Sequence, residues 1–409
     1  KNTDRPNLPF DNSPGDLERG GDAFMAVQKF QIDVPDGVLD DLQQRLSETR
    51  WPDEIPGSDW DYGSNLDYLK ELVEYWRTDF DWRAQEKFLN SFHHFKSQVD
   101  GMDIHFVHEK GTGPNPMPLV ITHGWPSTFF EMSKILPLLS DPGSHGSDPT
   151  DSFDVVAPSL PGFGFSDRPS QPGMQVLKVA DMWAKLMTEN LGYSRFAAHG
   201  GDIGAGVTSR LGYAHAPRLT GIHLTSITRP TPYQGPGSEP LSVEEQALVD
   251  QRERWQQAEG GYSHIQGTKP QTLSYGLNDS PVGLAAWIVE KYRTWSDCGG
   301  DVESRFTKDE LLTTVTIYWV TQTIGSSTRM YFENQRSLWS MGKGEKVDAP
   351  TAVALFPQDI ARPPREWAER SFNLGRWTEF TKGGHFAALE EPQLLAEDIR
   401  TFFRPLRTG

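Results

Sequence analysis

Short β-rich runs alternate with helical segments along most of this 409-residue chain. In segments such as 128–140 and 176–192, apolar residues recur at helical spacing. This alternation predicts an α/β fold with a mainly parallel central sheet covered by helices, and it places catalytic groups on loops at the carboxyl ends of the strands. The expected strands are residues 103–110, 117–124, 153–162, 195–200, 219–226, 351–357 and 376–385.

Three regions depart from this alternation. Residues 1–24 are rich in Pro, Gly and Asp without a sustained period, which predicts a polar tail. Residues 25–100 carry helix signals and are expected to be a helical region that precedes the first strand. Residues 227–345 contain helical pieces and little that resembles a core strand, so we expect a helical lid inserted into a core of residues 101–226 and 346–409.

Composition excludes several classes of partner. The formal net charge of −17, without a Lys/Arg-rich cluster, disfavours binding to nucleic acid. The apolar stretches are far shorter than the roughly 20 residues of a membrane-spanning helix, and a membrane anchor is not expected. Cys298 is the only cysteine, which fits a reducing cytoplasm, and its turn-like surroundings supply no basic group to activate it.

A glycine-rich turn follows the expected strand at 195–200. Residues 199–206 read HGGDIGAG, in which small residues flank Asp202 on both sides. This spacing is typical of the sharp turn between a strand and a helix that presents a catalytic nucleophile, a position that serine usually occupies. We therefore predict that Asp202 is a carboxylate nucleophile.

An acid and a histidine follow Asp202 in the chain order nucleophile, acid, histidine. The histidine is His385, which comes after the expected strand at 376–385 and its Gly pair. The acid expected to orient it is Asp359, just beyond the strand at 351–357. Other acids lie nearby and remain alternatives: Glu345, Asp348 and Glu366.

The HGWP segment at residues 123–126 follows another expected strand. In folds of this kind the loop after that strand presents one backbone N–H, and the residue after the nucleophile presents a second. The backbones of Trp125 and Ile203 are therefore expected to form an oxyanion hole.

Taken together, these motifs resemble those of the microsomal-type epoxide hydrolases of the α/β-hydrolase superfamily. The motifs that carry the resemblance are HGWP, GGDIG, FPQD and GGHFAALEEP in the core, and GYSHIQGTKP and YGLNDSPVGLAAWIVEKYRTW in the insertion. The resemblance runs from about residue 25 to the end of the chain. It implies an α/β-hydrolase fold with a helical N-terminal extension and a lid.

The resemblance also implies roles for further residues. Tyr262 and Tyr331 match the two lid tyrosines that donate a proton to the epoxide oxygen, whereas His123 and His199 match positions with a structural hydrogen-bonding role. Two departures from the mammalian enzymes are expected: their membrane anchor is not expected here, and Asp359 stands where they have glutamate. It is similar to soluble bacterial members, which include enzymes that act on epoxides in antibiotic biosynthesis.

A carboxylate can do at this turn what a hydroxyl cannot. Serine attacking an sp³ carbon would leave a stable ether, whereas Asp202 is ionised at neutral pH and would leave an ester. His385, oriented by Asp359, would then activate water to hydrolyse that ester. The predicted reaction converts a small-molecule epoxide and water into a vicinal diol, without a cofactor or metal.

Two other functions share parts of this pattern. A haloalkane-type dehalogenase uses the same ester chemistry, but it typically has a tryptophan after the nucleophile to hold the halide, where this chain has Ile203. A non-catalytic protein that binds an apolar ligand would be expected to lack a member of the triad. The sequence also leaves the oligomeric state open, with a homodimer as the working hypothesis.

Overall fold

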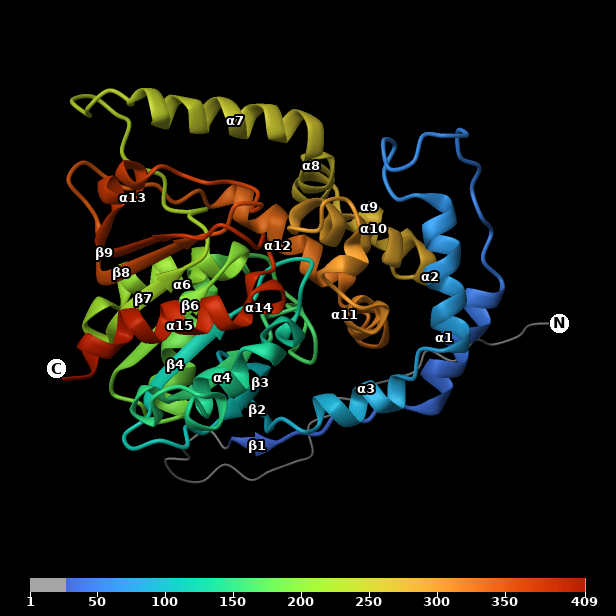
Figure 1. The fold of residues 1–409 in the computed structure, drawn as a ribbon, viewed down its shortest axis with the longest axis horizontal. Helices are drawn as coiled ribbons and strands as arrows, with labels where there is room; N and C mark the ends of the chain where they lie inside the picture. Colours follow the sequence, from blue (N-terminus) through green and yellow to red (C-terminus); the bar gives the residue numbers. More distant parts are fainter. Residues whose placement is uncertain (1–26, 409) are drawn as a thin grey trace.

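The structure is a computed structural model that describes residues 27–408, and the tail expected at residues 1–24 lies outside the described residues. Its centre is a nine-stranded sheet (Figure 1) with the strand order β1-β2-β3-β5-β4-β6-β7-β8-β9. The strands are β1 Gln28–Lys29, β2 His94–Val99, β3 Met102–Glu109, β4 Met117–Thr122, β5 Phe153–Pro158, β6 Phe196–Gly200, β7 Leu219–Leu224, β8 Val347–Leu355 and β9 Phe372–Glu379.

The strands from β5 to β9 in this order are all parallel, and those from β1 to β5 are antiparallel. The central strands are nearly continuous apolar runs because both faces of the sheet are covered. All six residues of β5 and all five of β6 are buried. The mainly parallel α/β sheet expected from the sequence is confirmed.

The expectation that residues 25–100 precede the first strand is wrong. β1 and β2 lie in this region, and β2 pairs with β3 along its whole length. The sequence of β2, HFKSQV, mixes buried, half-buried and exposed residues, and it lacks the apolar run that marks the central strands. The same region does hold α1 Asp36–Ser47, α2 Leu66–Thr78 and α3 Trp82–Leu89.

Helices cover both faces of the sheet. Successive side chains of a strand point to opposite faces of the sheet. In β6, a side chain at Gly200 would meet α6 on one face. On the other face, the ring of His199 contacts the ring of His223, which in turn contacts Asp398 of α15. The helices around the sheet are α4 Leu136–Ser140, α5 Val176–Lys185, α6 Asp202–Ala214, α13 Arg365–Ser371, α14 Ala387–Glu390 and α15 Pro392–Phe403. The segment expected to be helical at 128–140 is divided between a 3₁₀ helix, η1 Phe129–Lys134, and α4.

A helical insert separates β7 from β8. It contains α7 Val243–Glu259, α8 Gly261–Thr268, α9 Pro270–Leu277, α10 Pro281–Trp295, α11 Lys308–Thr321 and α12 Ile324–Arg336. The N-terminal helices brace this insert: α1 and α2 contact α10, and α2 also contacts α11 (Figure 1). One of the anchoring contacts is the hydrogen bond from Ser64 Oγ to Ala286 O, at 2.8 Å.

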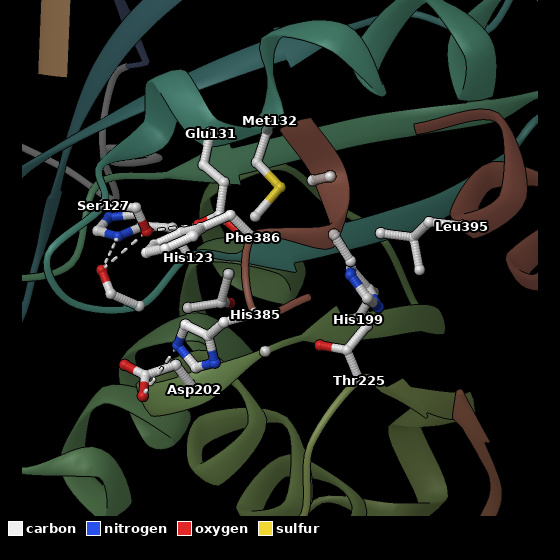
Figure 2. Close-up of a pocket in the computed structure, with 15 residues that line it drawn as sticks. His123, Ser127, Glu131, Met132, His199, Asp202, Thr225, His385, Phe386 and Leu395 are labelled. Atoms are coloured by element: carbon white, nitrogen blue, oxygen red, sulfur yellow. Dashed lines mark hydrogen bonds and ion pairs between the residues drawn. The ribbon is translucent and has the colours of Figure 1, made fainter. Parts of the chain in front are cut away.

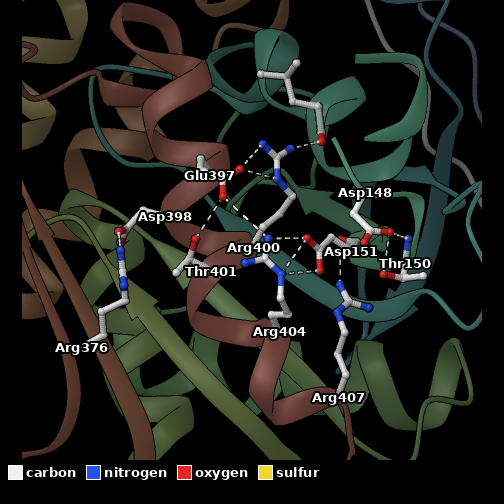
Figure 3. A network of polar contacts seen from close by, with 11 residues as sticks. Asp148, Thr150, Asp151, Arg376, Glu397, Asp398, Arg400, Thr401, Arg404 and Arg407 are labelled. Atoms are coloured by element: carbon white, nitrogen blue, oxygen red, sulfur yellow. Dashed lines mark hydrogen bonds and ion pairs between the residues drawn. The ribbon is translucent and has the colours of Figure 1, made fainter. Parts of the chain in front are cut away.

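The segment after α15 is anchored by an ion pair in which only the carboxylate is buried (Figure 3). The carboxylate of Asp151 is 2% exposed and accepts hydrogen bonds from Nε and Nη2 of Arg404, at 3.0 and 2.6 Å. Arg407 donates to the backbone oxygen of Asp151 at 2.7 Å. These contacts fix the end of the chain against the loop that leads into β5.

Candidate active site

The turn between β6 and α6 has the strained geometry that its sequence predicts. Asp202 is the first residue of α6, and its φ of +48° lies in the left-handed region that side chains other than glycine rarely adopt. Close packing requires a glycine in this turn, Gly204, and another in the HGWP segment, Gly124. A Cβ at Gly204 would lie 2.0 Å from Thr122 O, and one at Gly124 would lie 2.4 Å from Asp202 Cβ. The turn thus holds the Asp202 carboxylate at the carboxyl edge of the sheet.

One backbone N–H contacts the carboxylate of Asp202, and two hydroxyls contact its backbone. The N–H of Trp125 donates to Asp202 Oδ1 at 2.9 Å, and the N–H of Asp202 itself donates to Ser226 Oγ at 3.1 Å. Ile203 is the second residue of α6, in the first turn of the helix, where backbone N–H groups have no partner within the helix. The first of the two predicted oxyanion-hole donors therefore already contacts the carboxylate.

His385 lies between two carboxylates. Its Nδ1 is 2.6 Å from Asp359 Oδ1, and its Nε2 is 3.7 Å from Asp202 Oδ2. Two of the three alternative acids are engaged elsewhere, since Glu366 accepts from Ser242 and Glu345 accepts from the N–H of Gly342. The third, Asp348, is an exposed residue of β8. The tertiary structure thus brings Asp359 to His385.

This environment perturbs the imidazole. Burial by itself lowers the pKa of His385, but the charge and hydrogen bond of Asp359, together with the charge of Asp202, outweigh it and raise the pKa to about 9. At neutral pH the imidazolium form is therefore favoured while Asp202 is charged.

The two predicted tyrosines meet above Trp125. The rings of Tyr262 and Tyr331 are 5.9 Å apart and nearly perpendicular, and Tyr262 stacks on Trp125 at 5.3 Å. Burial is the main cause that raises the pKa of each phenol, and the nearby charge of Asp202 raises both further. Both tyrosines therefore stay protonated at neutral pH and can donate a proton.

Sequence reasoning missed two residues at this site. Trp295 accepts a hydrogen bond from the N–H of His385 at 2.8 Å through its backbone oxygen, and its ring lies edge-on to the imidazole at 5.2 Å. Glu131, on η1, accepts a hydrogen bond from Ser127, and burial raises its pKa to about 7 although that hydrogen bond and the charge of His385 lower it. An acid directly after two phenylalanines was the available signal for Glu131.

The ring of His123 is held by the backbone of two loops. Both ring nitrogens of His123 contact backbone groups, Gly124 O at 2.9 Å and Leu160 N at 3.2 Å, which is a structural role. Across residues 27–408, no group of three or more His, Cys, Asp or Glu side chains is arranged to hold a metal ion. None of the helices described there has the length and apolar character needed to span a membrane.

Comparison with known proteins identifies the family. Residues 27–132 match the model described as the epoxide hydrolase N terminus, and residues 117–392 match the alpha/beta hydrolase fold. Epoxide hydrolase 1 of Sus scrofa is 38% identical over 92% of this chain and 88% of its own length. A protein of Stigmatella aurantiaca, itself an inferred epoxide hydrolase, is 45% identical over 93% of this chain and 86% of its own length.

The chain belongs to the epoxide hydrolase family. Solved structures agree with this assignment. The juvenile hormone epoxide hydrolase of Bombyx mori has a TM-score of 0.83 and 29% identity, and it covers 94% of this chain and 95% of its own. The epoxide hydrolase of Aspergillus niger has a TM-score of 0.81 and 30% identity, with coverages of 94% and 97%. The α/β-hydrolase fold and the enzyme class expected from the sequence are confirmed, and the dehalogenase and non-catalytic alternatives are not supported.

Proposed function

We propose that this epoxide hydrolase works through a covalent ester on Asp202, which water activated at His385 then hydrolyses. The observation that carries the proposal is the placement of one carboxylate. Asp202 stands at a turn with positive φ, with the N–H of Trp125 on one oxygen and His385 Nε2 3.7 Å from the other. A carboxylate so placed can act as a nucleophile and, once esterified, as an electrophile.

Ring opening is the first step. A carboxylate oxygen of Asp202 forms a bond to an epoxide carbon, and the bond from that carbon to the epoxide oxygen breaks. The oxygen takes a proton from Tyr262 or Tyr331, because an unprotonated alkoxide is a poor leaving group. The phenols' raised pKa keeps that proton available at neutral pH.

Ester formation prepares the second step. It removes the negative charge of Asp202, which is one of the charges that raise the pKa of His385. The pKa of His385 then falls, and the proton it releases balances the phenolate left by ring opening. The neutral imidazole can now act as a base.

Hydrolysis closes the cycle. Water gives a proton to His385 Nε2, and its oxygen bonds to the carboxyl carbon of Asp202, while the N–H groups of Trp125 and Ile203 stabilise the oxyanion. The ester bond to the substrate breaks, and the departing alkoxide takes the hydroxyl proton of the intermediate. Asp202 is again a carboxylate, His385 is again charged, and the diol is free.

A single turnover in ¹⁸O-water with excess enzyme tests this mechanism, with styrene oxide as the probe. The expected first diol carries unlabelled oxygen from Asp202, and the label enters the peptide that contains Asp202. Label in the first diol would show direct attack of water on the epoxide and would reject the ester. Assays of 1-chlorobutane for chloride release should be negative, because Ile203 has no side-chain N–H to bind a halide.

The helical insert, residues 227–345, is proposed to serve as the lid because it carries both tyrosines. The natural substrate is proposed to be a small-molecule epoxide. A cytoplasmic location, a homodimer and a place in antibiotic biosynthesis remain predictions from the sequence.

A further inference from the structure

Residues 383–386, which we call the base loop, carry His385 between β9 and α14. His385 and Phe386 line a small cavity together with Asp202 (Figure 2). Asp359 contacts the imidazole at Nδ1, at 2.6 Å. The position of Nε2, which takes a proton from water in the proposed mechanism, also depends on where the backbone of the base loop lies.

Two backbone N–H groups of the base loop donate to the helical insert. The N–H of Gly383 donates to Asp297 Oδ2 at 2.9 Å, and the N–H of His385 donates to Trp295 O at 2.8 Å. Trp295 is the last residue of α10, and Asp297 lies in the loop after that helix. A side chain and a carbonyl of the insert therefore hold the backbone that presents the base.

The glycines of the base loop are needed for this contact. Gly383 has a φ of +97°, in the left-handed region that favours glycine. A Cβ at Gly384 would lie 2.7 Å from Trp295 O and 2.9 Å from the backbone N of Asp297, so a larger residue there would push the two segments apart. The Gly pair thus lets the base loop lie directly on residues 295–297 of the insert.

Glu390 ties the same two segments together on the other side of His385. This residue, at the end of α14, accepts from the N–H of Phe386 through Oε1 at 3.0 Å and from the N–H of Asp297 through Oε2 at 2.8 Å. Arg305 Nη2 donates to Asp297 Oδ2 at 2.9 Å. Because the backbone and the carboxylate of Asp297 are both held, the carboxylate is fixed where it meets the base loop.

We propose that Asp297 is a positioning residue for the base: its carboxylate docks the base loop on the insert and so holds His385 Nε2 where water attacks the Asp202 ester. This inference rests on the proposed ester mechanism. The core holds Gly383 at its oxygen, which accepts from the N–H of Gln358 at 3.1 Å. Asp297 holds the N–H of the same residue, so the base loop is fixed between the core and the insert. The insert that carries the two tyrosines then also sets the position of the base.

Only the second chemical step should depend on this contact. Ring opening in the proposed mechanism uses Asp202, at the turn between β6 and α6, and does not use His385. The proton donors Tyr262 and Tyr331 lie on α8 and α12, which pack against each other within the insert. Release of the base loop should therefore slow ester hydrolysis and leave ester formation largely intact.

The test measures the two steps separately. Rapid mixing with styrene oxide, acid quenching and intact-protein mass spectrometry follow the ester as it forms and decays. In Asp297→Ala we expect ester hydrolysis to slow about 10- to 100-fold, the effect of a base displaced by about 1 Å. Ester formation should stay within about threefold of the wild-type rate, because the contact is used only in the later transition state. A preserved rate of ester formation also shows that the variant is folded.

Two matched variants accompany Asp297→Ala. In Asp297→Asn the amide oxygen can accept from the N–H of Gly383 in place of Oδ2, so ester hydrolysis should return to within a few-fold of wild type. Asp154 has contacts of the same kind outside the site, since it accepts from the N–H of Gly111 at 2.9 Å and from Lys110 at 3.0 Å. Asp154→Ala should leave the rates of both steps unchanged even where thermal stability falls.

Each outcome decides the proposal. Wild-type hydrolysis in Asp297→Ala, an equal slowing of both steps, or an Asp297→Asn variant as slow as Asp297→Ala would overturn the role of Asp297. If the wild type forms no ester at all, the proposed mechanism itself fails. A normal ester in the wild type, with unaffected decay in Asp297→Ala, rejects the Asp297 inference alone.

Hydrogen exchange of the wild type adds a test that needs no variant. Peptides that contain residues 383–386 and residues 295–297 should show one common free energy of opening, because segments that form one cooperative unit open together. Much faster exchange in the base loop than in residues 295–297 would overturn the proposed docking, even where Asp297→Ala does not fold.

Discussion

His385 Nε2 lies 3.7 Å from Asp202 Oδ2, whereas its Nδ1 lies 2.6 Å from Asp359 Oδ1. The imidazole is thus hydrogen-bonded to Asp359, whereas its interaction with Asp202 is a longer ion-pair contact. The looser contact suits a base that must serve a water rather than the nucleophile, because Asp202 needs no help to become ionised. The two steps of the proposed mechanism can therefore be separated by mutation.

Replacing the base should trap the covalent intermediate. In His385→Gln, ring opening should persist because Asp202 is still a carboxylate, whereas ester hydrolysis should slow by at least about 10²-fold without a general base. Intact-protein mass spectrometry after mixing with styrene oxide should show stoichiometric addition of one substrate. Asp202→Ala is the control and should show no addition, and addition in that variant would place the nucleophile elsewhere.

The charge of Asp202 should be visible in the titration of His385. The negative charge favours the imidazolium, so Asp202→Ala should lower the pKa of His385 below the wild-type value of about 9. NMR of ¹⁵N-labelled imidazole groups can follow this titration. The imidazole signals of His145, an exposed histidine whose ring contacts the backbone oxygen of Asp141, are the internal control and should be the same in wild type and variant. An unchanged pKa at His385 would contradict the proposed coupling between ester formation and base activation.

The two phenols should share the protonation of the epoxide oxygen. Tyr262→Phe and Tyr331→Phe should each slow ester formation by about 10²-fold, the usual effect of losing one donor to a developing oxyanion. The double variant should form no detectable ester, and ester hydrolysis should be less affected than formation. Rapid-quench kinetics give both rates.

A tyrosine outside the site provides the control for this pair. Tyr193 donates to Asp154 at 2.7 Å and contacts none of the site residues described above. Tyr193→Phe should leave both rates unchanged. Full activity in the Tyr262/Tyr331 double variant would show that another group protonates the oxygen.

The C-terminal ion pairs should contribute to stability rather than to chemistry. Asp151→Ala removes a buried carboxylate that accepts from Arg404, and we expect the free energy of unfolding to fall by about 1–3 kcal/mol. Urea denaturation gives this value. Glu369→Ala is the contrasting change in an exposed pair, with Arg365 on α13, and it should cost less than about 1 kcal/mol. Equal losses would show that burial does not strengthen the Asp151 contact.

Local sequence determined the parts of this molecule that depend on neighbours in the chain. The central strands are apolar runs that only a sheet covered on both faces can bury, and β4, β5, β6 and β7 lie where those runs predict. The turn at Asp202 could be predicted for a similar reason. Backbone atoms approach its glycines so closely that a Cβ would not fit, and this need for glycine can be read directly from residues 199–206.

Tertiary structure decided what depends on partners far apart in the chain. β2 is a strand because β3 pairs with it, and its polar sequence gives little sign of that. Asp359 rather than Glu366 reaches His385 because of where the loop after β8 lies. The ring of His199 is linked to a carboxylate on α15 through a histidine on β7, 175 residues from that carboxylate. Hydrogen-bond partners of this kind are selected by packing in three dimensions, and the order of residues along the chain does not encode them locally.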